Sequence, residues 1–138
     1  MLELNRISAG YGKQTVLDGI SVDFEKGKLT SIIGVNGCGK STLLKAILGI
    51  LSLSNGEIFI DGENLLTISR NEIAKKIAYL SQGKNIPDMT VEQMVLHGRF
   101  PYLSYPRRYS SHDREVAIKA METVGVAEFA HKPLYSLS

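Results

Sequence analysis

Residues 34–42 read Gly-Val-Asn-Gly-Cys-Gly-Lys-Ser-Thr, and this stretch decides the fold. It matches the pattern G-x-x-x-x-G-K-[ST], in which glycines let a loop curl its backbone N–H groups around phosphate. The β-rich run Leu29–Ile33 comes before it, and apolar residues at helical spacing after Lys40 predict a helix over 41–51. A phosphate-binding loop requires this order of strand, loop and helix. The sequence therefore predicts an α/β protein built around such a loop.

The residue types in the loop explain the predicted chemistry. A helix that begins near Lys40 directs its unpaired N–H groups and the positive end of its dipole at bound phosphates. Lys40 adds a mobile charge for the β- and γ-phosphates, and the Ser41 hydroxyl can ligate Mg²⁺. The alternative interpretation is a tight strand-to-helix turn that holds no ligand. The candidate binding residues are Gly34, Asn36, Gly37, Cys38, Gly39, Lys40, Ser41 and Thr42.

The composition around the loop is that of an ordinary globular domain. The 138 residues carry 16 Lys+Arg against 14 Asp+Glu, a net charge of +2, and 43% are hydrophobic. These values exclude collagen-like, mucin-like and strongly disordered classes. Area scaling allows about two-thirds of the unfolded surface to be buried, enough for a core. The single cysteine, Cys38, cannot form an internal disulfide, and with no histidine near it in sequence we interpret it as a small loop residue.

Periodicity and capping signals extend the prediction outward from the loop. Further strands are predicted at 2–8, 16–24, 57–60 and 77–81, with a polar loop at 9–14. Capping boxes that begin at Ser69 and Thr90 predict helices to about residues 76 and 98. A longer helix is predicted at 113–124 and ends at Gly125, because glycine favours the position after a helix. Residues 99–110 are rich in proline, tyrosine and arginine and are interpreted as an irregular surface loop.

Two residues outside the loop gain meaning from it. Tyr11 lies in a polar turn before the second predicted strand, where an exposed aromatic ring could stack on a base. Gln82 follows the strand predicted at 77–81, and ligands of open α/β sheets bind at the carboxyl ends of strands. An ordinary turn tyrosine and a solvated loop glutamine are the alternatives.

Taken in order, these residues resemble the nucleotide-binding subunit of ABC transporters, from Leu2 to Ser138. The resemblance implies the P-loop nucleoside triphosphate hydrolase fold, present as its N-terminal portion: an antiparallel β subdomain, part of the parallel core sheet and part of the helical subdomain. It implies a single domain portion over 1–138, with the β-rich and P-loop core over about 1–85 and the start of the helical subdomain over about 86–138.

The family's site residues map onto several positions. Tyr11 matches the aromatic residue that stacks on adenine, and Val16 the apolar residue that supports the nucleotide. Gly34–Thr42 matches the Walker A loop, and Gln82 the glutamine that reaches Mg²⁺ and the attacking water. The resemblance thus implies Lys40 and Gln82 as catalytic residues, Ser41 and Gln82 as metal ligands, and ATP with Mg²⁺ as cofactors.

The segment after Gln82 resembles the subgroup that energises import of iron–siderophore, haem or cobalamin. Thr90-Val91, His97-Gly98-Arg99 and Pro101-Tyr102 carry this likeness. The implied partners are a second nucleotide-binding subunit, transmembrane permease subunits and, indirectly, an extracytoplasmic solute-binding protein. The implied place is peripheral, on the cytoplasmic face of the plasma membrane, and the sequence has neither a signal-peptide pattern nor an apolar run of membrane-spanning length.

The last three residues, Ser136-Leu137-Ser138, resemble the opening of the family's LSGGQ signature. In the family the rest of that signature, the Walker B aspartate with its glutamate, and the switch histidine lie further along. No apolar run ending in Asp-Glu occurs in the sequence, and the context of the three histidines, His97, His112 and His131, does not match the switch. The 138-residue chain is therefore expected to bind Mg·ATP weakly and not to hydrolyse it.

Two alternative functions stay open at this point. One is a nucleotide-binding regulatory or interaction module that never hydrolyses ATP, and the other is an ABC-type ATPase without a transporter. The basic and aromatic loop Arg99–Tyr109 also suggests nucleic acid, but the nearly neutral charge argues against that partner. We expect no nucleic-acid partner and interpret the loop as a surface or permease-docking segment.

Overall fold

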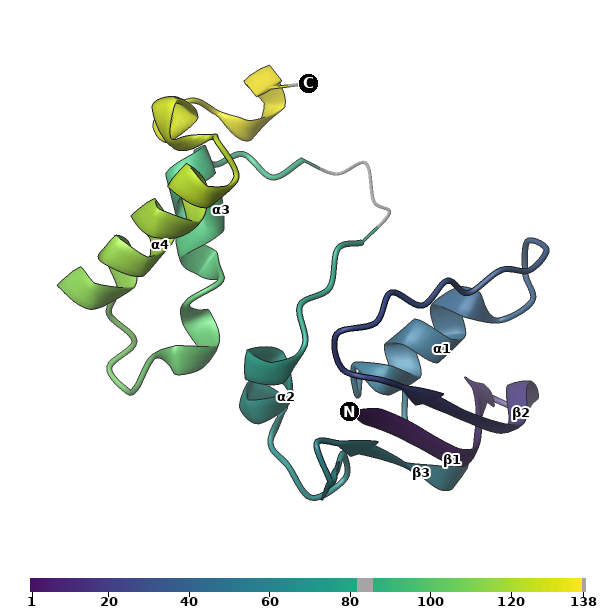
Figure 1. Ribbon diagram of the computed structural model, residues 1–138. Helices are drawn as coiled ribbons and strands as arrows, with labels where there is room; N and C mark the ends of the chain where they lie inside the picture. The colour runs from purple at the N-terminus through teal and green to yellow at the C-terminus, as the bar shows by residue number, and fades with distance from the viewer. Residues whose placement is uncertain (82–85, 138) are drawn as a thin grey trace. The chain divides into compact units, whose positions relative to one another are not determined.

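The computed structural model describes residues 1–81 and 86–137, and its internal contacts form two compact units (Figure 1). The first unit is Met1–Ala78 and contains a β-sheet and two helices; the second is Tyr79–Ser138 and is helical. Within those described ranges, no helix combines the length and the apolar character needed to cross a bilayer.

The sheet of the first unit is antiparallel, with the strand order β2-β1-β3-β4. Its strands are β1 (Leu2–Tyr11), β2 (Gln14–Phe24), β3 (Asn55–Ile60) and β4 (Glu63–Asn64). The polar loop predicted at 9–14 is wrong, because Tyr11 pairs with Gln14 and only two residues make the turn. Gly10 permits this pairing, since a Cβ at that position would lie 1.9 Å from the Gln14 carbonyl oxygen.

Helix α1 (Lys40–Ile47) packs its apolar face on the sheet and completes the core. The helix contributes the buried residues Leu43, Ala46 and Ile47 to a cluster with sheet residues such as Leu4 and Ile58. The predicted helix continues to residue 51, but α1 ends four residues earlier, at Ile47. Gly49 follows with φ +65°, a left-handed conformation that interrupts helical hydrogen bonding.

The strands predicted at 29–33 and 77–81 are not strands in the structure. Both segments are extended without ladder partners, and Leu29, Ile33 and Leu80 are 98%, 92% and 96% exposed. A β-strand exists through hydrogen bonds to a neighbouring strand, and in the described part of the chain neither run belongs to the sheet. The prediction includes part of the parallel core sheet. In the structure, the two apolar segments predicted to belong to it are extended but do not pair as strands.

Short helices confirm the predicted capping signals. Helix α2 (Arg70–Lys76) is capped by Ser69, whose hydroxyl accepts the Glu72 N–H, whereas the Glu72 carboxylate pairs with Lys75. Helix α3 (Val91–His97) begins at a complete capping box formed by Thr90 and Gln93. Helix α4 (Ser111–Thr123) begins two residues before the prediction and ends before Gly125, whose φ is +72°.

In the second unit, α3 and α4 pack together through Val91, Leu96, Ala117 and Met121. The described part of this unit also contains turns of 3₁₀ helix: η1 (Phe100–Tyr102), η2 (Ala127–Phe129) and η3 (Leu134–Leu137). The backbone around Thr90 and Pro133 forms an antiparallel bridge that ties the chain after α4 back to the start of α3.

Asp113 anchors the irregular segment between α3 and α4. Ser110 donates to Oδ2 of Asp113 through both its hydroxyl and its N–H, and Arg99 Nε donates to Oδ1 at 3.0 Å. The Asp113 residue is only 7% exposed, and these hydrogen bonds, those of Ser110 first, lower its pKa to about 2. Ser110 and Asp113 form a capping box in which Asp stands at the fourth position in place of the usual Glu or Gln.

We expect the second unit to lose stability as the pH falls from about 4 toward about 2, the interval between the ordinary and the folded pKa of Asp113. A carboxyl whose pKa is lowered by folding stabilises the fold above its unfolded pKa, and this contribution disappears as pH approaches the folded value. Asp113→Asn should lower the urea midpoint at neutral pH and flatten its acid decline, both measured by far-ultraviolet circular dichroism. Glu122→Gln, an equal charge change at an exposed position of α4, is the control. An acid decline as steep in Asp113→Asn as in the unmodified chain would contradict this assignment.

Candidate functional site

The loop 34–39 approaches α1 through a β-turn and a left-handed glycine. Cys38 N–H donates to the Val35 carbonyl at 3.3 Å, and Gly37, the third residue of that turn, has φ +82°. Gly39 has φ +99° and is buried against β2, where a Cβ would lie 3.3 Å from Val16 Cγ1. At Gly34 a Cβ would lie 2.6 Å from Cys38 Sγ. The path of the loop therefore favours glycine at Gly37 and Gly39, whereas a side chain at Gly34 would require only the Cys38 thiol to move.

The ammonium group of Lys40 bridges the two ends of this loop. Its Nζ donates to the carbonyl oxygens of Gly34 at 2.7 Å and Val35 at 2.8 Å, and lies 3.7 Å from Cys38 Sγ. No carboxylate in the described part of the chain pairs with Lys40. The charge is thus held at the loop without a neutralising acid, which leaves it available to an anion.

The start of α1 differs from the starts of the other α-helices in the described residues. Helices α2, α3 and α4 each have a Ser or Thr side chain that accepts an N–H of the first turn. Helix α1 begins at Gly39, has no side-chain cap and has no acidic residue in its first turn. Ser41 is exposed at this end. Uncapped N–H groups, the helix dipole, an uncompensated ammonium and an exposed hydroxyl form a set that suits a phosphate chain with its Mg²⁺.

Tyr11 and Val16 lie close to this end of α1. Lys45 Nζ lies 3.3 Å from the Tyr11 phenol oxygen, and the side chains of Thr42 and Lys45 lower the pKa of Tyr11 through hydrogen bonds, that of Thr42 first. Val16 packs on Gly39 from β2. The structure thus brings these two predicted residues, Tyr11 and Val16, to the loop and α1. The contact with Lys45 has no sequence signal, because 34 residues separate it from Tyr11.

The predicted residue Gln82 lies outside the described residues, so its contact with the site stays a prediction. Among the residues that the structure describes, no group of three His, Cys, Asp or Glu side chains could hold a metal ion. Ser41 stays the predicted metal ligand that the structure describes at this site, and its hydroxyl is on an exposed residue.

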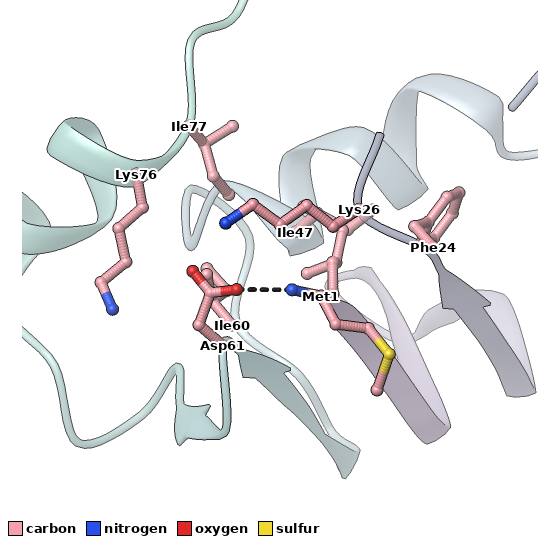
Figure 2. A pocket seen from close by; sticks show the side chains of 9 residues that line it. Met1, Phe24, Lys26, Ile47, Ile60, Asp61, Lys76 and Ile77 are labelled. Atoms are coloured by element: carbon pink, nitrogen blue, oxygen red, sulfur yellow. Dashed lines mark hydrogen bonds and ion pairs between the residues drawn. The ribbon is translucent and has the colours of Figure 1, made fainter. Parts of the chain in front are cut away.

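A cavity of about 270 Å³ opens elsewhere in the first unit (Figure 2). Apolar side chains of β1, β2, β3 and α1 form its wall, and the N-terminal ammonium of Met1 pairs with Asp61 at its mouth. That ammonium, through its hydrogen bond first, lowers the pKa of Asp61, and Lys26 and Lys76 act in the same direction. None of the predicted nucleotide-site residues that the structure describes lines this cavity, so the loop and the cavity are separate features.

Several curated proteins similar in sequence are named as ATP-binding proteins of siderophore or iron import or transport. The chain is 36% identical over 138 residues to the petrobactin import ATP-binding protein FpuD of Bacillus anthracis, covering 99% of this chain and 50% of the relative. It is also 36% identical to the ferric enterobactin transport ATP-binding protein FepC of Escherichia coli (strain K12), covering 96% and 49%. The chain spans about half the length of these relatives.

Solved structures of the same architecture extend the comparison to the fold. A nucleotide-free ATP-binding cassette from an ABC transporter matches with a TM-score of 0.81 at 24% identity, covering 96% of this chain and 56% of that one. The cassette MJ1267 matches with a TM-score of 0.80 at 25% identity, covering 100% and 59%. These matches confirm the P-loop hydrolase fold that the family resemblance implies, with its antiparallel sheet. The family model described as "ABC transporter" matches residues 17–138, which include the whole loop and α1, and the chain belongs to that family.

Proposed function

We propose that this chain binds Mg·ATP at the loop 34–39 and α1, as part of the ATP-hydrolysing subunit of an importer. The observation that carries the proposal is the combination at one point of an uncapped helix N-terminus and the Lys40 ammonium, which no described carboxylate neutralises. An anion with several charged oxygens is the ligand that compensates both groups at once. A tight turn without a ligand would have no need of either.

The proposed roles follow from the positions of the groups. The N–H groups of the loop and of the first turn of α1 bind the β- and γ-phosphates, and Lys40 exchanges its bonds to the loop carbonyls for bonds to phosphate oxygens. The exposed Ser41 hydroxyl supplies one Mg²⁺ ligand, and Gln82 is proposed as a second. Mg²⁺ would neutralise the charge that develops on the transferring phosphoryl group. Tyr11 and Val16 are proposed to hold the base.

The transported material is proposed to be a metal chelate of the iron–siderophore, haem or cobalamin class. The names of several similar proteins support this class, since they specify petrobactin, ferric enterobactin and iron(3+)-hydroxamate import or transport. The proposed partners are a second nucleotide-binding subunit and transmembrane permease subunits, with a solute-binding protein acting indirectly. The proposed place is the cytoplasmic face of the plasma membrane, and the proposed extent of the helical subdomain is about 86–138.

A nucleic-acid partner is not part of the proposal. The segment 99–109 is basic and aromatic, but two of its three arginines contact its own rings. Arg99 lies 4.0 Å from the Tyr102 ring centroid and also pairs with Asp113, and Arg107 lies 4.5 Å from the Phe100 centroid. Cations engaged in this way are less available to a phosphate backbone.

The proposal is tested by calorimetric titration of the chain with Mg·ATP. We expect a dissociation constant on the order of 10⁻⁴ M, which weakens when Mg²⁺ is removed with a chelator. Ser41→Ala should abolish most of this Mg²⁺ dependence and leave Mg²⁺-free ATP binding in place, because it removes the hydroxyl ligand alone. Ser52→Ala, a serine on the exposed surface after α1, is the matched control. Absence of binding at millimolar Mg·ATP by a folded preparation would refute the proposal.

A further inference from the structure

Lys45 is a charged residue of α1 to which the proposed phosphate chemistry gives no role. Its ammonium lies 3.3 Å from the Tyr11 phenol oxygen and pairs with no carboxylate in the described part of the chain. The charge therefore acts on the tyrosine. Tyr11 itself is 48% exposed, so half of its surface remains open to a ligand.

Two distances place the ammonium at the edge of the ring. Nζ lies 3.3 Å from the phenol oxygen but 5.6 Å from the ring centroid. A cation stacked over the face of the ring would lie nearer to the centroid than to the phenol oxygen. The Lys45 ammonium lies nearer to the oxygen, so it is placed beside the hydroxyl edge of the ring. This arrangement fixes the hydroxyl end of the Tyr11 ring. The Lys45 side chain does not cover the faces of the ring, so a base would not have to displace it in order to stack there.

The same helix therefore holds both parts of the proposed site. Lys45 follows Ser41 by four residues and lies on the same face of α1, one turn further from the loop. Anchoring Tyr11 to α1 sets the distance between the ring and the phosphate-binding end of that helix, which is the distance that a nucleotide must span.

We propose that Lys45 is a positioning residue for the nucleotide base, and that it acts by anchoring the hydroxyl of Tyr11 to α1. This inference rests on the proposed function and deepens it, because it assigns the preference for a nucleoside over bare phosphate to a contact between α1 and the β1–β2 turn. The simpler alternative is that Lys45 only places a positive charge in the last turn of α1, where it favours the helix dipole.

The test compares binding of Mg·ATP with binding of inorganic Mg·triphosphate, which has the phosphates without the base. Lys45→Met keeps the length of the side chain and removes its charge and donors, and Tyr11→Phe keeps the ring and removes the anchored oxygen. Each variant should lower the ratio of ATP affinity to triphosphate affinity by about three- to tenfold, the effect of one lost hydrogen bond. The double variant should lower it no further, because both changes break the same contact.

Lys45→Arg is the rescuing variant, since it restores a cationic donor at the same position and should recover most of the ratio. If Lys45→Met leaves the ratio unchanged, or weakens both ligands equally, the positioning role is wrong. If Lys45→Met does not fold, Tyr11→Phe decides the question, because it removes the other half of the same contact. Failure of the unmodified chain to bind either ligand would instead refute the proposed function, and this inference with it.

Discussion

Replacing Lys40 with alanine is expected to weaken binding of both Mg·ATP and Mg·triphosphate by about 10- to 100-fold, the usual range for losing a hydrogen bond to a charged group. In the free protein the ammonium donates to the carbonyls of Gly34 and Val35, so it already lies at the mouth of the loop. A bound phosphate would receive those same donors. Because the lost group contacts phosphate, the two ligands should lose affinity alike, in contrast to the variants of Lys45. Calorimetric titration with each ligand measures the effect.

Lys28→Ala is the matched control for Lys40→Ala. Lys28 belongs to the same unit, is 68% exposed and pairs only loosely with Glu25 at 3.8 Å, so its removal changes the net charge by the same amount away from the loop. Its affinity for both ligands should stay within about twofold of the unmodified chain, since surface charges contribute little. Equal losses in the two variants would show that Lys40 acts only through net charge, and would contradict a direct contact with phosphate.

The 138-residue chain is expected to release phosphate from Mg·ATP about 10²- to 10⁴-fold more slowly than a full-length relative, the range that a positioned general base contributes. Lys40, the loop N–H groups and Mg²⁺ would stabilise charge on the transferring phosphoryl group. The carboxylate that positions the attacking water is, by the family resemblance, further along than the segment beginning at Ser136. A phosphate-release assay on a preparation verified by intact mass measures the rate.

Two comparisons make that rate interpretable. Lys40→Ala reports the background from contaminating ATPases, because it removes a proposed phosphate contact without changing how the protein is purified. The relative FpuD of Bacillus anthracis, 36% identical over this chain, serves as the full-length standard. A rate equal to that of the standard, and abolished by Lys40→Ala, would show that these residues suffice for hydrolysis and would overturn the expectation.

The helices and the antiparallel strands could be predicted because their signals are local. The Thr90 capping box involves residues three apart, and the glycine that follows α4 lies immediately after its last turn. Strand 29–33 was predicted from the same kind of local pattern, yet it forms no ladder. β propensity describes how a residue fits a sheet, and it cannot specify whether a neighbouring strand is there to pair with. The predicted end of β1 is wrong for a related reason. Tyr11 pairs with Gln14 across a turn of two residues, and that turn resembles a longer polar loop in sequence.

In the candidate site too, the features set by neighbouring residues could be predicted, whereas the contacts between distant residues could not. The spacing of Gly34, Gly39 and Lys40 identifies the loop, because its chemistry depends on neighbours in the chain. The bonds from Lys40 to the loop carbonyls, and from Lys45 to Tyr11, depend on how the chain returns on itself. No pattern of residue types along the sequence encodes those distances. Lys45 was therefore missed, although it lies only five residues after Lys40.

The extended run Leu29–Val35 has a practical consequence for anyone who handles this chain. Its seven residues, Leu-Thr-Ser-Ile-Ile-Gly-Val, contain no charge and no proline, and Leu29, Ile33 and Val35 are 98%, 92% and 78% exposed. Uncharged β-prone segments of this length, open along their backbone, are templates for cross-β stacking between molecules. Solubility would then be governed by this short segment and not by the balanced surface charge. Ser31→Lys, an exposed position of this run outside the loop 34–39, would place a gatekeeper charge against fibril growth.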